Sequence, residues 1–301
     1  MSVVVTGSAG FVGRVLVDRL AGAGHRVVAV DRRPHSAPSG VTVLTADLLD
    51  ADSRVETALR EADAVIHLAG CPGVREAGPG VEARRRRDNV AATARLTRLV
   101  PAHVPLVVAS SSSVYGGVRH GRACRESDPV RPIGGYARSK WCVERLCAER
   151  ADVGGQVLVV RPFTVVGEGQ RADMALSRWA AQALVRRPLR IFGSLQRTRD
   201  VTCVREVARG LEALALSGAT GVVNLGSGHP RTLGAMVDCL ADALGVEVEV
   251  QVEPAAPYEV ADTWADLTRF ARITGFTPQT DLADVVRRFV AATAPALAEA
   301  G

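Results

Sequence analysis

The chain has 301 residues, 47% of them hydrophobic, so it can bury a full core as one large domain or as one domain with a smaller lobe. No apolar run approaches the roughly 20 residues of a membrane span, and the chain opens directly into an apolar segment that leaves no room for a signal peptide, so we expect a cytoplasmic protein without a membrane partner. The net charge is +5, but aromatic residues make up only 4% and do not interleave with the basic ones, so we expect no nucleic-acid partner.

The six cysteines and six histidines are scattered along the chain. The cysteines have neither a pairing pattern nor metal-ligand spacing, which favours reduced cytosolic thiols. The histidines form no ligand pair on a helix. We therefore predict no metal site.

A glycine-rich loop follows the first apolar segment. Residues 3–5 predict a short buried strand, and Gly7, Gly10 and Gly13 follow at three-residue spacing before a helical pattern. The first glycine permits a tight turn, the second lets the backbone approach a pyrophosphate, and the third lets helix and strand pack closely. Free amides at the helix start favour anions. The loop therefore predicts a dinucleotide site.

A second predicted strand, residues 26–30, runs into Asp31. A carboxylate at this place would hold the hydroxyls of the adenosine ribose, which favours NAD over NADP. Arg32 and Arg33 follow, and arginine at this place can receive a 2′-phosphate, so NADP stays as the alternative. Asp47, after a third strand, either contacts the adenine amine or is simply an acid in a loop.

The fourth predicted strand, residues 63–70, ends in small residues against which a cofactor could lie. We expect His67 to pack within this strand rather than to act in catalysis. Strands and helices alternate along the chain, which predicts an α/β fold with a parallel doubly wound sheet. The arginine run at residues 84–87 is either a solvated helix face or an attractor of an anionic substrate.

A strand at residues 106–109 ends in four serines, where open α/β sheets place their ligands. Tyr136 and Lys140 lie four residues apart on a predicted helix and so share one face. We expect the lysine charge to lower the pKa of the tyrosine, and a nearby serine to share its proton. Such a group can move a proton on or off an alcohol while hydride leaves or joins its carbon. Taken alone, neither pattern indicates function, because an amphipathic helix can contain Tyr-x-x-x-Lys by chance and a serine run after a strand is usually just a loop.

Two later stretches, residues 232–244 and 282–294, predict amphipathic scaffold helices. Pro295 is expected to end the second helix.

Many ordered motifs together resemble the extended short-chain dehydrogenases/reductases of the NAD-dependent epimerase/dehydratase family that act on nucleotide sugars. The resemblance covers essentially the whole chain. It implies a Rossmann-type domain over residues 1–165, a mainly substrate-binding lobe over residues 166–301 with some segments returning to the first domain, and a homodimer. It rests on residues 6–13, Asp31, 47–48, 67–70, Asn89, 110–116, Tyr136, Lys140, 161–163, 199–200, 224–228 and 265–266.

The resemblance implies catalytic roles for Ser111, Tyr136 and Lys140. The family's cofactor contacts fall, residue by residue, on Gly7, Ala9, Gly10, Phe11, Val12, Gly13, Asp31, Arg32, Asp47, Leu48, Leu68, Ala69, Gly70, Asn89, Ser110, Tyr136, Lys140 and Pro162.

The positions after the catalytic serine separate the family's reactions. Sugar 4,6-dehydratases carry Asp and Glu there, whereas this chain has Ser112 and Ser113, so elimination is not favoured. In the family's 4-epimerases, tyrosinate takes the proton of the C4 hydroxyl while NAD takes hydride. The keto-sugar then turns over and hydride returns to its other face. The resemblance thus implies a nucleotide-sugar 4-epimerase.

Three features bear on the sugar. Thr164 and Arg171 are similar to the branch with UDP-glucuronate 4-epimerases, where these residues help hold the sugar carboxylate, and Ser112 could add a contact. The alternative is an arginine on a mobile loop. Arg199 resembles the arginine that binds the nucleotide diphosphate, with a structural salt bridge to Asp200 as the alternative.

The chain departs from the family pattern in four places. Val166 stands where a tyrosine is common, and Glu168 and Gly169 replace a Pro-Arg-like pair. Residues 256–259 replace a run whose arginine also binds phosphate, and Gly134 and Gly135 replace the usual residues before the active tyrosine. The rival function is therefore an NAD(P)H-dependent ketoreductase or dehydrogenase of a sugar. A non-enzymatic NAD-binding regulator is a third reading, which the presence of both Tyr136 and Lys140 disfavours.

Overall fold

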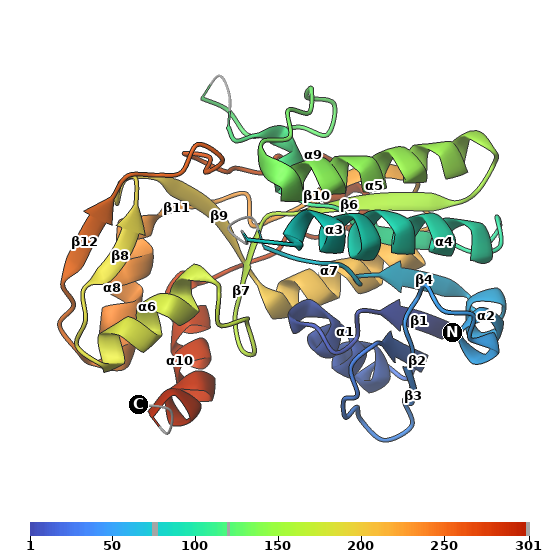
Figure 1. Ribbon diagram of the computed structural model, residues 1–301, viewed down its shortest axis with the longest axis horizontal. Coiled ribbons are helices and arrows are strands. Elements are labelled where there is room, and N and C mark those ends of the chain that lie inside the picture. The colour runs from blue at the N-terminus through green and yellow to red at the C-terminus, as the bar shows by residue number, and fades with distance from the viewer. Residues whose placement is uncertain (74–77, 119–120, 299–301) are drawn as a thin grey trace.

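The computed structural model describes residues 1–73, 78–118 and 121–298. Its centre is a seven-stranded sheet of order β10-β6-β5-β4-β1-β2-β3, with every neighbouring pair parallel (Figure 1). The order reverses beside β1, as in a doubly wound sheet, which confirms the predicted fold class. The strands are β1 (Ser2–Thr6), β2 (Arg26–Asp31), β3 (Thr42–Thr45), β4 (Ala64–His67), β5 (Leu106–Ala109), β6 (Val157–Pro162) and β10 (Gly221–Leu225).

Helices bury both faces of this sheet, which is why its strands are apolar on both sides. Successive side chains of a strand point to opposite faces, and Val3 and Val4 are both fully buried in different core clusters. One cluster lies under α1 (Phe11–Gly22), α7 (Val204–Leu216) and α9 (Thr268–Thr274). The other lies under α2 (Ser53–Arg60), α4 (Ala92–Leu99) and α5 (Gly134–Asp152). Between β4 and α4 the chain forms α3 (Val81–Arg85) and the π-helix η1 (Arg86–Ala91).

A smaller lobe lies at one end of the main sheet (Figure 1, left). Its own apolar core joins α6, α8 and α10 to the inner strands. The lobe contains a three-stranded sheet of order β11-β9-β7 and a two-stranded sheet β12-β8. Its elements are β7 (Thr164–Val166), α6 (Ala175–Leu184), β8 (Leu189–Phe192), β9 (Thr198–Cys203), β11 (Pro230–Thr232), α8 (Leu233–Leu244), β12 (Val250–Glu253) and α10 (Leu282–Ala298).

The helix predicted at residues 232–244 is confirmed as α8. The prediction that Pro295 ends the last helix is wrong, because α10 continues to Ala298. A proline inside a helix lacks its own backbone donor, but it leaves the donors of the following residues in place. In the part of the chain that the structure describes, no helix is long and apolar enough to cross a membrane.

Candidate active site

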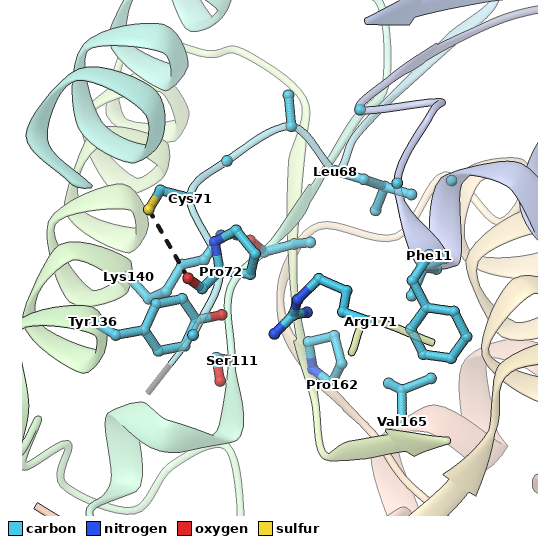
Figure 2. A pocket seen from close by; sticks show the side chains of 18 of the residues that line it. Phe11, Leu68, Cys71, Pro72, Ser111, Tyr136, Lys140, Pro162, Val165 and Arg171 are labelled. Atoms are coloured by element: carbon cyan, nitrogen blue, oxygen red, sulfur yellow. Dashed lines mark hydrogen bonds between the residues drawn. The ribbon is translucent and has the colours of Figure 1, made fainter. Parts of the chain in front are cut away.

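A cavity of 890 Å³ opens at the carboxyl ends of the central strands, next to the point where the strand order reverses (Figure 2). The smaller lobe closes its other side through Thr164, Arg171 and Arg199. Every predicted cofactor residue except Asn89 lines this cavity, as do all the predicted catalytic and substrate residues. The sequence motifs therefore meet at one place, and the roles assigned to them stay predictions.

The glycine-rich loop is packed so closely that side chains do not fit. Gly7 has φ of +74°, and a Cβ there would lie 2.5 Å from the backbone nitrogen of Ala69. A Cβ on Gly13 would overlap the carbonyl of Gly7. Gly10 precedes α1 and has no side chain to cap the helix amides. The loop therefore offers bare backbone donors to an anion, as a dinucleotide pyrophosphate requires.

Asp31 is fixed at the end of β2 by backbone donors. Its carboxylate accepts hydrogen bonds from the amides of Ala9 (3.0 Å) and Arg33 (2.9 Å). The guanidinium of Arg33 donates to the carbonyl of Ala9 (3.0 Å), so both residues are tied to the glycine-rich loop. Arg32 instead pairs with Asp88 at 3.1 Å. The carboxylate suited to a ribose diol is therefore held in the cavity wall, and the two arginines that could receive a 2′-phosphate already have partners.

Helix α5 presents Tyr136 and Lys140 to the cavity from one face, as predicted (Figure 2). Ser111, after β5, hydrogen-bonds the tyrosine hydroxyl. The ammonium of Lys140 donates to the carbonyl of Ala109 (2.9 Å), which ties the helix to the end of β5. Proton donor, acceptor and cation thus lie together at the strand ends.

The expected lowering of the tyrosine pKa is wrong for this structure. Burial raises the pKa of Tyr136 above its usual value, although the hydrogen bond from Ser111 and the charge of Arg171 act in the opposite direction. Burial also lowers the pKa of Lys140 to about 8. Desolvation disfavours tyrosinate and ammonium alike, and it outweighs the neighbouring charges.

Glu144 is a buried residue of the site that the sequence analysis missed. It continues the Tyr136–Lys140 stripe by one more turn of α5. Its carboxylate accepts from Ser110 Oγ (2.6 Å) and from two nitrogens of Arg161 (2.9 and 2.7 Å). Both members of this pair are 4% exposed. The pair locks β5, β6 and α5 together behind the catalytic side chains, and the four-residue spacing was the signal that could have revealed it.

Asn89 does not line the cavity but supports its wall. Its side chain accepts from the amide of Cys71 (2.6 Å) and donates to the carbonyl of Cys71 (3.2 Å) and to Ser139 Oγ (2.8 Å). It thereby holds the loop after β4 against α5. A direct contact of Asn89 with the cofactor stays a prediction.

His67 is packed in β4, which confirms its structural interpretation. Its ring nitrogens hydrogen-bond Thr6 Oγ1 (2.7 Å) and Thr93 Oγ1 (3.0 Å). It is 2% exposed, and burial lowers its pKa to about 3. A neutral imidazole therefore bridges two hydroxyls inside the sheet layer.

The arginines on the substrate side are held in different ways. Arg171 faces Tyr136 across the cavity (Figure 2) and pairs with Asp173 at 2.8 Å, with both side chains more than one-third exposed. Arg199 donates to the carbonyls of Val260 (3.0 Å) and Ala261 (2.7 Å). The alternative role of Arg199, a structural salt bridge with Asp200, is not what the structure shows. The fully buried carboxylate of Asp200 instead accepts hydrogen bonds from the backbone amides of residues 227, 228 and 265.

The segment that departs from the family pattern also lines the cavity. Tyr258, Glu259 and Val260 belong to its wall. Gly134 has φ of +81°, and a Cβ there would lie 3.3 Å from the Tyr258 side chain. No local motif marks these wall residues, because the fold brings them in from far along the chain.

Comparison with known proteins agrees with this geometry. The model of the NAD dependent epimerase/dehydratase family matches residues 3–226. The chain is 30% identical to the uncharacterized UDP-glucose epimerase YtcB of Bacillus subtilis (strain 168), over 94% of this chain and 95% of that protein. The structure of UDP-glucuronic acid 4-epimerase from Bacillus cereus in complex with UDP-glucuronic acid and NAD superposes with a TM-score of 0.89 at 27% identity, covering 98% of this chain and 100% of that one. MoeE5 in complex with UDP-glucuronic acid and NAD superposes with a TM-score of 0.88 at 35% identity, with the same coverage of both chains.

Proposed function

Because the chain belongs to the NAD dependent epimerase/dehydratase family, we propose that it is an NAD-dependent 4-epimerase of nucleotide sugars whose substrate is a UDP-uronate. One observation carries the proposal. Ser111 and Tyr136 meet in a cavity that has a dinucleotide loop on one side and Arg171 on the other. Relatives of similar length are named as UDP-sugar epimerases, and structural neighbours hold UDP-glucuronic acid with NAD.

Bound NAD supplies the hydride acceptor for the oxidation and, once reduced, the hydride donor for its reversal. The chain's own residues handle the proton. Tyr136, hydrogen-bonded to Ser111, removes the proton of the C4 hydroxyl as the C4–H bond breaks, and returns it when hydride adds to the opposite face of the ketone. Lys140 supplies a positive charge beside the tyrosine. The reaction is therefore redox-neutral over one turnover.

The serines at the start of the short helix η2 (Ser112–Tyr115) argue against loss of water. Elimination needs an acid and a base near the leaving group, whereas Ser112 and Ser113 bring only hydroxyls to the cavity. The amide of Ser113 donates to Ser111 Oγ (3.2 Å), so this turn serves to fix the catalytic serine. Oxidation and reduction at a single carbon need nothing further from this turn.

We assign the sugar carboxylate to Arg171, Thr164 and Ser112. Arg171 and Thr164 line the cavity from the lobe, and Ser112 lines it from η2, after β5. A guanidinium can bind a carboxylate with two parallel hydrogen bonds, and Arg171 already does so with Asp173 (2.8 and 3.0 Å). An exposed pair of this kind costs little to exchange for a substrate carboxylate. Arg199, which donates to three backbone carbonyls, is assigned to the diphosphate.

The proposal also includes a homodimeric enzyme in the cytoplasm. The family resemblance supports the dimer, and the cysteines are scattered along the sequence without a pairing pattern, which is typical of reduced cytosolic proteins. Sedimentation equilibrium of the purified protein measures the oligomeric state, and a monomer at micromolar concentration would contradict this part of the proposal.

The test of function uses the protein as purified, with no added cofactor. The protein is denatured to identify the released dinucleotide, and native protein is incubated with UDP-glucuronate and, separately, with UDP-glucose. We expect stoichiometric NAD and a C4 epimer from UDP-glucuronate. Protein free of dinucleotide that turns over only when NAD(P)H is supplied would instead identify a reductase.

A further inference from the structure

A chain of ion pairs lies on the cofactor side of the cavity, far from the catalytic tyrosine in the sequence. Arg87 donates from one nitrogen to Asp88 (2.9 Å) and from the other to Asp47 (2.8 Å). Asp88 also binds Arg32 (3.1 Å). The order of the chain is thus Asp47–Arg87–Asp88–Arg32, and all its members line the cavity. The arginine run noted in the sequence therefore contains one residue that faces the cofactor site.

Neighbouring residues within the π-helix η1 lie differently with respect to the cavity. Arg87 and Asp88 both reach the cavity wall, whereas Arg86 is exposed and lies outside the cavity lining. Single turns of π-helix are uncommon and often occur at functional sites. The side chain of Asp88 is only 8% exposed, while those of Arg32 and Arg87 are 54% and 46% exposed. The nearly buried carboxylate of Asp88 is thus paired with two arginines whose side chains are about half exposed to solvent.

The topology places this chain of ion pairs across the dinucleotide loop. Arg32 follows β2 and Asp47 follows β3, on one side of β1 in the sheet. Arg87 and Asp88 come after β4, which pairs with the other side of β1. The ion pairs therefore connect the two flanks of the glycine-rich loop. Arg32 also directly follows Asp31, so the link lies at the adenosine end of the cavity.

The pairs involve ionised groups. Burial works to raise the pKa of Asp47, but hydrogen bonds from Leu49 and Arg87 and the charges of Arg87 and Arg32 bring it below its usual value. Single exposed ion pairs contribute little, whereas a network that shares a desolvated carboxylate contributes more.

We propose that Asp47, Arg87, Asp88 and Arg32 form an electrostatic clasp that closes over the adenosine end of the bound dinucleotide and slows its release. A 4-epimerase regenerates its cofactor in every turnover and has no need to exchange it. Two of these pairs cross between the flanks, Arg87–Asp47 and Arg32–Asp88. Loss of Arg87 leaves the single Arg32–Asp88 pair to hold the flanks together, and one half-exposed pair holds them less firmly than the network does. In this protein the four ion-paired residues therefore help to retain the cofactor, in addition to the glycine-rich loop that binds its pyrophosphate.

The test measures release of NADH from the loaded protein, without substrate, by its fluorescence change when excess NAD is added. Arg87→Ala should release NADH about 10-fold faster than the wild type. Arg86→Ala is the matched control, since it removes the same charge from the next position of η1 and should release at the wild-type rate. Raising the salt from about 0.05 M to about 0.5 M should speed release from the wild type and have a smaller effect on Arg87→Ala.

A second variant distinguishes the ion-pair clasp from a simple attraction between the charge of Arg87 and the anionic cofactor. Arg87→Lys keeps the charge but cannot bridge two carboxylates as the guanidinium does, so its release rate should lie near that of Arg87→Ala. It also serves if the alanine variant folds poorly, as judged by its melting temperature. Equal release from Arg87→Ala and Arg86→Ala, or wild-type release from Arg87→Lys, would overturn the proposal.

Discussion

The two walls of the active-site cavity are built by different means. The cofactor wall consists of backbone and strand ends of a single parallel sheet, where Gly7 and Gly13 leave no space for a side chain. The substrate wall consists of side chains of the smaller lobe, chiefly Arg171 from a loop and Arg199 from β9. The first wall is rigid because its positions are set by backbone packing. The second can change its ligand through single substitutions, which is how one redox site can serve different sugars.

The comparison predicts how substitutions on the two sides differ. Changes at the catalytic residues should remove the reaction and leave the protein folded. Changes on the lobe side should alter the choice of sugar. Changes to polar residues buried within the sheet layer, such as His67, should affect stability alone.

The largest effect is expected for Tyr136→Phe. Loss of the residue that accepts and returns the proton should lower turnover by about 10³-fold or more, because positioned acid–base groups contribute roughly 10²–10⁴-fold. The melting temperature and the bound NAD should be unchanged, since the ring still fills its place. Turnover within a few-fold of the wild type would exclude Tyr136 as the base and remove the proposed mechanism.

Lys140→Met should lower turnover by about 10²-fold without lowering the melting temperature. Burial depresses the pKa of this lysine to about 8. Below that pH the folded protein holds a cation that the cavity disfavours, so the uncharged side chain removes a cost to stability as well as a catalytic charge. Calorimetry at pH 7 measures the melting temperature of the variant, and steady-state kinetics measure its turnover. A melting temperature several degrees below the wild type would show that the lysine serves mainly to hold β5 and α5 together.

Arg171→Ala tests the lobe side. We expect the preference for UDP-glucuronate over UDP-glucose, as a ratio of kcat/KM, to fall by about 10–100-fold, because a charge-assisted pair with the carboxylate is lost. Arg205→Ala is the control, since Arg205 pairs with Glu168 (2.8 Å) and does not line the cavity. An unchanged preference in Arg171→Ala would sink the assignment of the carboxylate.

The smallest effect on turnover is expected for His67→Asn, in strand β4. The folded-state pKa of His67 is about 3, below the ordinary value of 6.5, so the unfolded chain binds an extra proton between these values. Stability from this group is therefore complete above pH 6.5 and is lost as the pH falls toward 3. Unfolding free energies measured from pH 7 to 4 should fall less steeply in His67→Asn than in the wild type, by at most about 1.4 kcal/mol per pH unit. Parallel curves would show that His67 does not titrate on unfolding.

The sequence was most informative where function depends on local spacing. The glycine-rich loop lies between one strand and one helix, and Tyr136 and Lys140 lie one turn apart, so a short stretch defines each geometry. Asp31 could be placed beside this loop because the strand that carries it, β2, pairs directly with β1. These residues could be placed in one cavity before the structure because open α/β sheets bring the ends of their strands together.

Contacts between distant segments could not be read in the same way. Glu144 and Arg161 form their buried pair across two elements, and Arg87 meets Asp47 only after β3 and η1 fold to the same edge. The pKa of Tyr136 was predicted with the wrong sign because spacing reveals its charged neighbours but not the extent of its burial. Composition and motifs carry no measure of desolvation, which is the largest influence on the pKa values of Tyr136 and Lys140.

The proposed 4-epimerisation is tested most directly by following the hydrogen at C4 of the sugar. UDP-glucuronate carrying deuterium at C4 is incubated with the purified protein in the absence of added dinucleotide, and the product is analysed by mass spectrometry and NMR. We expect a C4 epimer that retains the deuterium at C4, because the hydride leaves and returns within one site. An epimer that has exchanged the label for solvent hydrogen, or a net oxidised or reduced product, would contradict it.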